Sequence, residues 1–319
     1  MKALIIGAAG FVGGHLITHL LGEGWEVVAT KLPHEMCGIL YMCNVQDVSM
    51  VDLDILNTAA IQLLLEQVQP DILFHLAAQS SVARSWESPA LTVDVNIKGA
   101  VNLLEAIRAV QKPIRVLLIG SGEEYGPAVQ MPINENDALR PTNIYALTKM
   151  AQGLMGQIYA KAYDLDIIVV RAFNHTGPGQ SEQFVISSFC KQAAQIKEGL
   201  LPPEMQVGNL EAQRDFCDVR DIVRAYCLLA ECGHRGTVYN VGSGRAVSIQ
   251  TVLDTILSLI ETNVTVTRDP ARMRPSDTPL MMADIFRLTA HTQWKPQIPL
   301  ETTLIDMLRY WTLEGREHK

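Results

Sequence analysis

Three side chains near the middle of the sequence have the types and spacing needed to move a proton to a carbonyl oxygen. Tyr145 and Lys149 stand four residues apart, which places both on one face of a helix. A phenol titrates at about pH 10, so it exchanges protons poorly at neutral pH unless a nearby cation lowers its pKa. Lys149 supplies that cation, and the hydroxyl of Ser121 can bind the same oxygen. This set predicts proton donation to a ketone as hydride reaches its carbon.

The first thirteen residues predict where the hydride donor binds. Three glycines spaced G-x-x-G-x-x-G separate an apolar run at 2–6 from an apolar-periodic segment at 11–22. Between a strand and a helix, such a turn lets a diphosphate approach the backbone, where free N–H groups and the helix dipole meet the anion. The alternative is a tight turn that needs glycine for its backbone conformation. The residues expected to contact the dinucleotide are Gly7, Gly10, Phe11, Val12 and Gly13.

The end of the second predicted strand, at 25–31, indicates which dinucleotide binds. An acid often stands there and binds the ribose 2′-hydroxyl of NAD. Here the strand ends in Thr30 and Lys31, and a hydroxyl with a cation suits a 2′-phosphate better than a carboxylate would. We therefore expect NADP(H), with NAD(H) as a second cofactor. For Lys31, a solvated strand end is the alternative.

Two later strand ends complete the predicted cofactor site. A carboxylate at Asp52, beside Leu53, would reach the adenine amino group. Small residues after the strand at 71–76 would let the cofactor pass closely, although tight packing explains them equally well. This last group comprises Leu76, Ala77 and Ala78.

Composition excludes several classes of protein. The 319 residues carry a net charge of −8 without a basic stripe, which argues against a nucleic-acid partner. The six cysteines form no C-x-x-C pair and are typical of a reducing compartment. His15 and His19 lack a third ligand, so we expect no metal. A signal-peptide layout is missing, and no apolar run reaches the ~18 residues that span a bilayer. We expect a cytoplasmic protein without a membrane partner.

Alternating strand-like and helical segments predict the scaffold that positions these residues. Nearly all-apolar strands that alternate with helices indicate a parallel sheet covered on both faces, here a doubly wound α/β (Rossmann) sheet. The predicted strands are 2–6, 25–31, 71–76, 115–119 and 166–171, and the helices 11–22, 58–67, 91–110 and 144–163.

Beyond Arg171 the amino-acid composition changes, because 172–214 is rich in Gly, Pro, Asn and Gln. We interpret this part as a smaller C-terminal substrate-binding lobe over the carboxyl edge of the sheet. The predicted division is 1–171 with about 215–243 for the NADP-binding domain, and 172–214 with 244–319 for the lobe. Later predicted elements are strands 237–241 and 263–267 and helices 248–260, about 284–291 and 300–313.

Taken together, these motifs resemble the extended short-chain dehydrogenase/reductase family along nearly the whole chain. The family implies nucleotide-sugar substrates, a bound nicotinamide dinucleotide, and a Ser/Thr–Tyr–Lys centre, here Ser121, Tyr145 and Lys149. It also implies that Asn96 fixes the backbone beside Lys149. The segments that carry the resemblance are GAAGFVG (7–13), DLD (52–54), HLAAQSSV (75–82), DVNIKGAVNLLEA (94–106), SGEEYG (121–126), YALTK (145–149) and RAFNHTGPGQ (171–180).

Three further segments are similar to the GDP-mannose branch of that family, namely 173–185, 214–226 and 274–277. The resemblance implies that Arg214 and Arg274 face the diphosphate of a GDP-linked 6-deoxy sugar. Guanidinium groups suit this because they bind phosphate oxygens in pairs, whereas a solvated surface cation is the alternative for each. Asp277 would hold a ribose hydroxyl or order its loop, and Asn174 would contact the substrate.

The branch contains 4,6-dehydratases and 4-keto reductases, which differ in their need for a base. A dehydratase removes a C5 proton, commonly with a Glu beside the Ser/Thr, and Glu123 fills that position. The segment RDFCDVRD at 214–221 is nevertheless similar to that of the 4-keto-6-deoxymannose reductases. We therefore expect reduction to GDP-6-deoxy-D-mannose, with a dehydratase or bifunctional enzyme as the alternative. A remoter alternative is a non-catalytic NADP sensor, because a fold does not imply a function.

Small residues on the predicted helices 97–110 and 144–163 permit close helix packing. The family usually dimerises through four such helices, so the resemblance implies a homodimer. Packing of these helices on their own sheet is the alternative.

Overall fold

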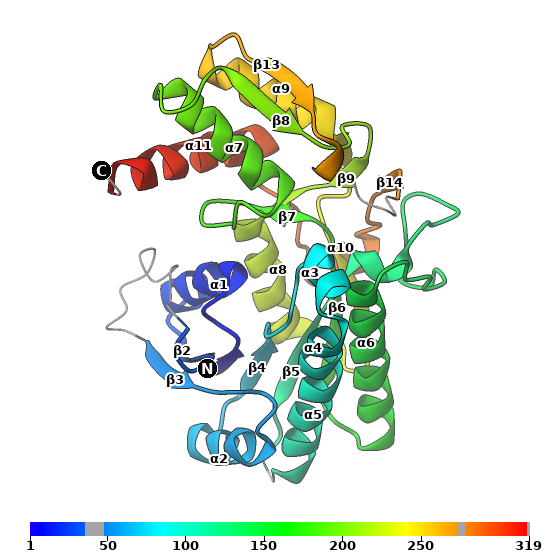
Figure 1. Ribbon diagram of the computed structural model, residues 1–319. Helices are drawn as coiled ribbons and strands as arrows, with labels where there is room; N and C mark the ends of the chain where they lie inside the picture. Colours follow the sequence, from blue (N-terminus) through cyan, green and yellow to red (C-terminus); the bar gives the residue numbers. More distant parts are fainter. Residues whose placement is uncertain (36–47, 111, 273–277, 318–319) are drawn as a thin grey trace.

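A seven-stranded parallel sheet lies at the centre of the structure, a computed structural model that describes residues 1–35, 48–110, 112–272 and 278–317 (Figure 1). Its strand order is β11-β6-β5-β4-β1-β2-β3, and every neighbouring pair is parallel. The strands are β1 (Lys2–Ile6), β2 (Glu26–Lys31), β3 (Ser49–Asp52), β4 (Ile72–His75), β5 (Arg115–Ser121), β6 (Ile167–Ala172) and β11 (Val238–Val241). This confirms the predicted doubly wound sheet. The strand order reverses between β1 and β4, where such sheets open a ligand crevice at their carboxyl ends.

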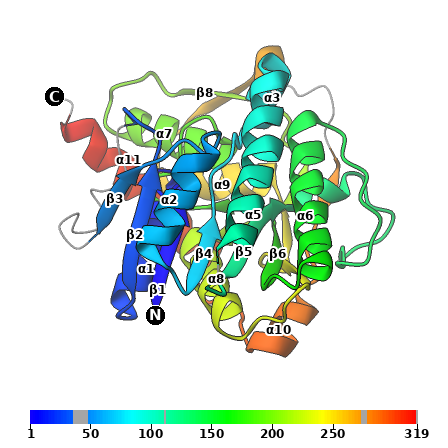
Figure 2. The same ribbon diagram turned by 90° about the horizontal axis from the view of Figure 1, so that it is seen from below.

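Helices cover both faces of the sheet, which explains why its strands are almost continuously apolar. Ala3 and Ile5 of β1 belong to one buried cluster with α1 and α8, whereas Leu4 and Ile6 belong to another with α2 and α5. Figure 2 shows α2, α5 and α6 side by side over this second face. The bounds are α1 (Phe11–Gly22), α2 (Thr58–Val68), α5 (Gly99–Ala109), α6 (Ile144–Ala162) and α8 (Val219–Cys232).

The predicted helix at 91–110 is confirmed as one continuous helical segment that contains a π-helical turn. After α3 (Val82–Glu87), Pro89 opens the short helix α4 (Pro89–Val93), as proline commonly does in a first turn. A π-helical turn at Asp94–Lys98 then leads into α5. Asn96 is fully buried in that turn and bonds both backbone groups of Gln79 and the Thr148 hydroxyl. These bonds explain the local departure from α-helix.

A second unit with its own apolar core lies beyond the carboxyl ends of the main strands (Figure 1). The prediction missed α7 within 172–214, because the Gly/Pro/Gln content of its flanks masks the helical spacing of Ile186, Phe189, Cys190 and Ala193. The helices of this unit are α7 (Val185–Lys197), α9 (Ile249–Ile260) and α11 (Leu300–Glu317). Its strands are β8 (Glu204–Val207), β9 (Gln213–Asp215), β12 (Ala246–Ser248), β13 (Thr265–Arg268) and β14 (Leu280–Met281). A further pair joins β7 (His175–Thr176) to β10 (Cys217–Asp218).

Helix α10 (Phe286–Thr292) departs from the predicted division, which assigned 244–319 to the lobe. Leu288 and Trp294 are buried in the core of the main sheet, beside α8. The Trp294 ring N–H donates to the backbone carbonyl of Asp221 at 3.1 Å, so this segment returns to the sheet domain. Within the described residues, we find no helix with the length and apolarity needed to cross a membrane.

Candidate active site

Ser121 and Tyr145 meet at the carboxyl end of β5. Ser121 is the last residue of β5, and Tyr145 lies in the first turn of α6. That helix begins there because the Asn143 side chain accepts a hydrogen bond from the Ala146 N–H at 2.8 Å. A side-chain hydrogen bond joins Tyr145 to Ser121. The structure thus brings together two of the three predicted proton-handling residues.

Lys149 lies one helical turn further along α6 and is almost fully buried. Its Nζ donates to the Ile119 carbonyl at 2.7 Å and to the Gln152 side chain at 3.3 Å. Burial lowers the pKa of Lys149 to about 8, and the carboxylate of Glu124 opposes that shift. The sequence placed Lys149 correctly on the Tyr145 side of α6, but the ammonium points to the strand end.

The pKa of Tyr145 moves in the opposite direction from the one that the sequence predicted. Burial raises it above the ordinary phenol value, and the carboxylates of Glu123 and Glu124 add to this rise. The hydrogen bond with Ser121 opposes it. Tyr145 is therefore a neutral phenol at neutral pH, the form that can donate a proton.

The glycine turn after β1 is shaped for a close approach of backbone and ligand. Gly7 has φ +84°, and a Cβ there would lie 2.5 Å from the Ala77 Cα. A Cβ on Gly13 would lie 2.1 Å from the Ala8 carbonyl oxygen. Gly10 precedes the first turn of α1 and has no side chain to cover its N–H groups. This open helix end fits a dinucleotide diphosphate.

Thr30 does not have the place that the sequence predicted. Its side chain is buried, and its Oγ1 accepts a hydrogen bond from the Gly7 N–H at 3.1 Å. Its carbonyl accepts the Ala8 N–H at 2.7 Å. The hydroxyl therefore holds the glycine turn instead of facing a 2′-phosphate.

The cation at this edge of the sheet is Lys31, one residue further on. Its Nζ contacts Asp52 Oδ1 at 2.6 Å, so Asp52 is ion-paired, and its contact with an adenine stays a prediction. Leu53 is buried, and its N–H donates to the Lys31 carbonyl.

The remaining predicted cofactor residues surround the same turn. The N–H groups of Leu76 and Ala77 both donate to the Ile6 carbonyl, which fixes the end of β4 against β1. The Ala77 backbone packs closely against Gly7, which accounts for the glycine, and the cofactor contact of Ala77 stays a prediction. Ala78 follows it, half-buried. Phe11 and Val12 pack against the core of the sheet.

Two of the four predicted substrate residues, Arg214 and Asn174, lie in the described part of the chain. Arg214 on β9 is buried, and its Nη1 donates to the carbonyls of Thr278 at 2.6 Å and Gln213 at 2.9 Å. Asn174 follows β6, half-buried, and its carbonyl accepts the Cys217 N–H. Arg274 and Asp277 lie outside the described residues.

Sequence reasoning missed a buried ion pair beneath Ser121. Glu124 and Arg171 are almost completely buried, and Glu124 Oε2 lies 3.0 Å from Arg171 Nε. The sequence contained one signal of this pair. Arg171 follows the apolar run of β6, and a charged residue in a buried strand needs a buried partner of opposite charge.

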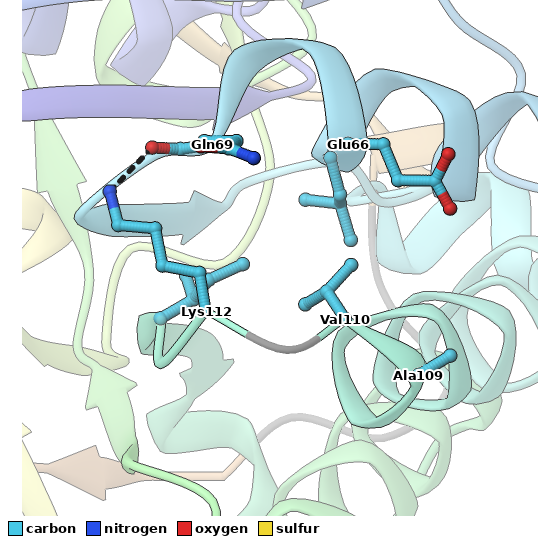
Figure 3. Close-up of a pocket in the computed structure, with 7 residues that line it drawn as sticks. Glu66, Gln69, Ala109, Val110 and Lys112 are labelled. Atoms are coloured by element: carbon cyan, nitrogen blue, oxygen red, sulfur yellow. Dashed lines mark hydrogen bonds between the residues drawn. The ribbon is translucent and has the colours of Figure 1, made fainter.

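A separate pocket lies at the other end of the strands (Figure 3). Its residues come from the last turns of α2 and α5 and from the segment before β5. The Lys112 Nζ donates to the Gln69 carbonyl at 2.7 Å across its rim. The pocket is remote from the glycine turn and from Tyr145, so it plays no part in the candidate site. It is lined by Leu65, Glu66, Gln69, Ala109, Val110, Lys112 and Ile114.

The fold, the open glycine turn and the Ser121–Tyr145 pair are those of an NAD(P)-dependent oxidoreductase, and the comparisons with known proteins place it among the enzymes of sugar nucleotides. The family model of GDP-mannose 4,6 dehydratase matches residues 4–307, so the chain belongs to that family. A GDP-6-deoxy-D-mannose reductase of Pseudomonas aeruginosa is 32% identical over 318 residues, which cover 99% of each chain. A GDP-mannose 4,6-dehydratase of Vibrio cholerae is 26% identical, over 96% of this chain and 92% of its own.

Among solved structures, RMD from Pseudomonas aeruginosa complexed with NADPH superposes with a TM-score of 0.86. It is 31% identical, and the match covers 98% of this chain and 100% of that one. This likeness supports the predicted cofactor, NADP(H).

Proposed function

We propose that the protein reduces the 4-keto group of GDP-4-keto-6-deoxy-D-mannose with NADPH and forms GDP-6-deoxy-D-mannose (GDP-D-rhamnose). The observation that carries this proposal is the end-to-end similarity to a GDP-6-deoxy-D-mannose reductase. The neutral phenol of Tyr145 supports it as well, because ketone reduction needs a proton donor.

When bound, NADPH supplies the hydride. Tyr145 donates its proton to the oxygen that was the ketone, and the Ser121 hydroxyl, beside the phenol, binds the same oxygen. Lys149 would hold the ribose next to the nicotinamide, and its positive charge would favour the phenolate that Tyr145 becomes. The glycine turn would hold the diphosphate, and Lys31 would attract the 2′-phosphate.

On the substrate side, we place the GDP-linked sugar between the sheet edge and the lobe. Arg214 binds the diphosphate after exchanging one of its carbonyl bonds for a phosphate oxygen. Arg274 and Asp277, outside the described residues, and Asn174 complete the set that the family resemblance implies.

A 4,6-dehydratase is the second candidate, and the observation in its favour is Glu123. The side chain is half-buried beside the reaction centre, and the Asn143 amide donates to it at 3.4 Å. A base at this place is what abstraction of the C5 proton requires.

We also propose a cytoplasmic homodimer. The outer face of α6 exposes Leu147, Leu154 and Ile158, and α4 beside it exposes Leu91 and Val93. A second copy of this surface would bury these apolar side chains symmetrically. Ile158→Glu should then convert the dimer to a monomer in light-scattering measurements.

The cytoplasm suits the free thiols of Cys190, Cys217, Cys227 and Cys232.

One experiment separates the reductase from its alternatives. Purified protein is incubated with GDP-mannose alone, and separately with GDP-4-keto-6-deoxy-D-mannose and NADPH, and the sugars are identified. We expect stoichiometric NADPH oxidation and GDP-6-deoxy-D-mannose in the second reaction, without product in the first. Conversion of GDP-mannose would favour the dehydratase, and inertness in both would favour the sensor.

A further inference from the structure

Beneath the reaction centre lies a carboxylate that the proposed mechanism does not use. Glu124 is fully buried, and both of its oxygens accept hydrogen bonds. Oε1 accepts the Ser121 N–H at 2.8 Å, and Oε2 accepts Arg171 Nε–H at 3.0 Å. Burial raises the pKa of the Glu124 carboxyl, and the Arg171 guanidinium and the Ser121 N–H oppose that rise because both favour the carboxylate. With a guanidinium bonded to one oxygen and an N–H to the other, the pair with Arg171 holds Glu124 as an anion.

The two elements that carry the reaction centre leave room for this anion. On β5, a Cβ at Gly120 would lie 2.3 Å from Glu124 Oε1, so a side chain there is incompatible with the carboxylate. On α6, a Cβ at Gly153 would lie 3.7 Å from Glu124 Oε2. Gly153 stands one turn after Lys149. The carboxylate thus sits between the strand of Ser121 and the helix of Tyr145 and Lys149.

The geometry points to Glu124 as a positioning residue, whose carboxylate fixes the backbone of Ser121 and maintains the positive charge of Lys149. It acts through these two neighbours, and its charge also raises the pKa of Tyr145. The inference rests on the proposed function only for the role of Lys149 toward the cofactor.

The groups around Lys149 support this role. Burial lowers the pKa of Lys149, and the charge of Glu124, from the turn Gly122–Tyr125, acts against it. His75 on β4 faces Lys149 as well, but burial lowers its pKa to about 3, so it stays neutral and offers no negative charge. The contacts from β5 and α6 are neutral oxygens of Ile119 and Gln152.

Arg171 ties the carboxylate to the rest of the sheet. Its Nη1 donates to the Tyr125 hydroxyl at 2.9 Å, and that hydroxyl donates to Asn240 on β11 at 2.7 Å. Removing Glu124 alone therefore leaves a buried guanidinium without its anion, which is destabilising. A fair test must separate that structural cost from the effect on Lys149.

The test measures NADPH binding by fluorescence between about pH 6 and about pH 9.5, without any sugar, in wild type and in Glu124→Gln. The amide retains an acceptor for the Ser121 N–H but removes the charge. We expect wild-type affinity to weaken with a midpoint near the Lys149 pKa of about 8. In the variant, Lys149 loses its proton more easily, so the midpoint should fall by about one pH unit. At the acidic end of the range, the NADPH affinities of variant and wild type should agree within about twofold.

Two further variants keep the test decisive. Glu124→Gln combined with Arg171→Met removes the unpaired guanidinium, and it should show the same shift if the single variant folds poorly. Asp166→Asn removes a carboxylate whose pair with Arg115 lies at the opposite ends of β5 and β6, and it should leave the midpoint unchanged.

An unchanged midpoint in both Glu124 variants would overturn the proposal, as would weaker binding by the same factor at every pH. Because no sugar is present, failure of the reductase assignment would leave this result standing.

Discussion

The two sides of the proposed site differ in the elements that hold their polar groups. On the sheet side, α1 presents an uncovered N-terminus at Gly10, and Tyr145 holds a neutral phenol beside Ser121. On the lobe side, Arg214 donates to two carbonyls. Its neighbour Asp215 accepts bonds from Ser243, Gly244 and Ala283.

This difference follows from how each side is built. Long buried strands and helices set the positions of the sheet-side residues before any ligand arrives. Short strands such as β9 and β14 are held by side-chain bonds to backbone, and those bonds must be rearranged if Arg214 is to reach a phosphate. We therefore expect the sheet side to control chemistry and the lobe side to control substrate affinity.

The largest expected effect comes from Tyr145→Phe, which removes a single hydroxyl. Turnover should fall by about 10²-fold or more, the scale of a lost general acid. NADPH binding and the melting temperature should change little, because the ring remains. Stopped-flow NADPH oxidation measures this, and near-normal turnover would exclude Tyr145 as the proton donor.

A second prediction tests whether the glycine turn is preformed. Gly13→Ala pushes a methyl into the Ala8 carbonyl, so NADPH affinity should fall by roughly tenfold or more, with a loss of about 1–3 kcal/mol of stability. Gly22→Ala, at the other end of α1, meets no atom within 4 Å. It should stabilise the protein by up to about 1 kcal/mol. Calorimetry measures the stability of both variants, and titration measures their NADPH affinity. Equal stability and equal affinity in the two variants would contradict the turn geometry.

On the lobe side, Arg214→Met should raise KM for the sugar nucleotide by roughly 10- to 100-fold, the value of hydrogen bonds to a charged group. The NADPH Kd and turnover at saturating substrate should stay close to wild type. Steady-state kinetics separate the two. If turnover falls while KM stays constant, the proposed distinction between the two sides is wrong.

The sequence predicted the sheet side well because its signals are local. Glycine spacing, apolar runs and the Tyr145–Lys149 interval depend on neighbouring residues, so strands β1, β5 and β6 and helices α1 and α6 appear near the predicted ranges. The bonds of Thr30 to Gly7 and of Glu124 to Arg171 join residues distant in sequence. Such partners, like the return of Trp294 to the main core, are fixed only by the completed fold.

The preference for NADPH over NADH tests whether the Thr30 side chain holds Gly7 or faces the 2′-phosphate. Lys31→Ala should lower the NADPH/NADH ratio of kcat/KM by about fivefold to tenfold, because a cation near the 2′-phosphate is lost. Thr30→Val removes the hydroxyl that holds Gly7, so it should weaken both cofactors by a similar factor. If Thr30→Val lowered the NADPH/NADH ratio and Lys31→Ala weakened both cofactors equally, the Thr30 hydroxyl would face the 2′-phosphate after all.

The smallest effect is expected at Glu123, and it decides between the two chemistries of the family. A dehydratase base must take the C5 proton, so Glu123→Gln would abolish dehydration of GDP-mannose. In ketone reduction no C–H proton is removed, and the proton comes from Tyr145. Glu123 then shapes the pocket through Asn143, and its carboxylate only raises the pKa of Tyr145 further. We therefore expect Glu123→Gln to retain reduction within about tenfold, a cost of at most about 1.4 kcal/mol in transition-state stabilisation. Conversion of GDP-mannose by wild type that disappears in this variant would replace the reductase with the dehydratase.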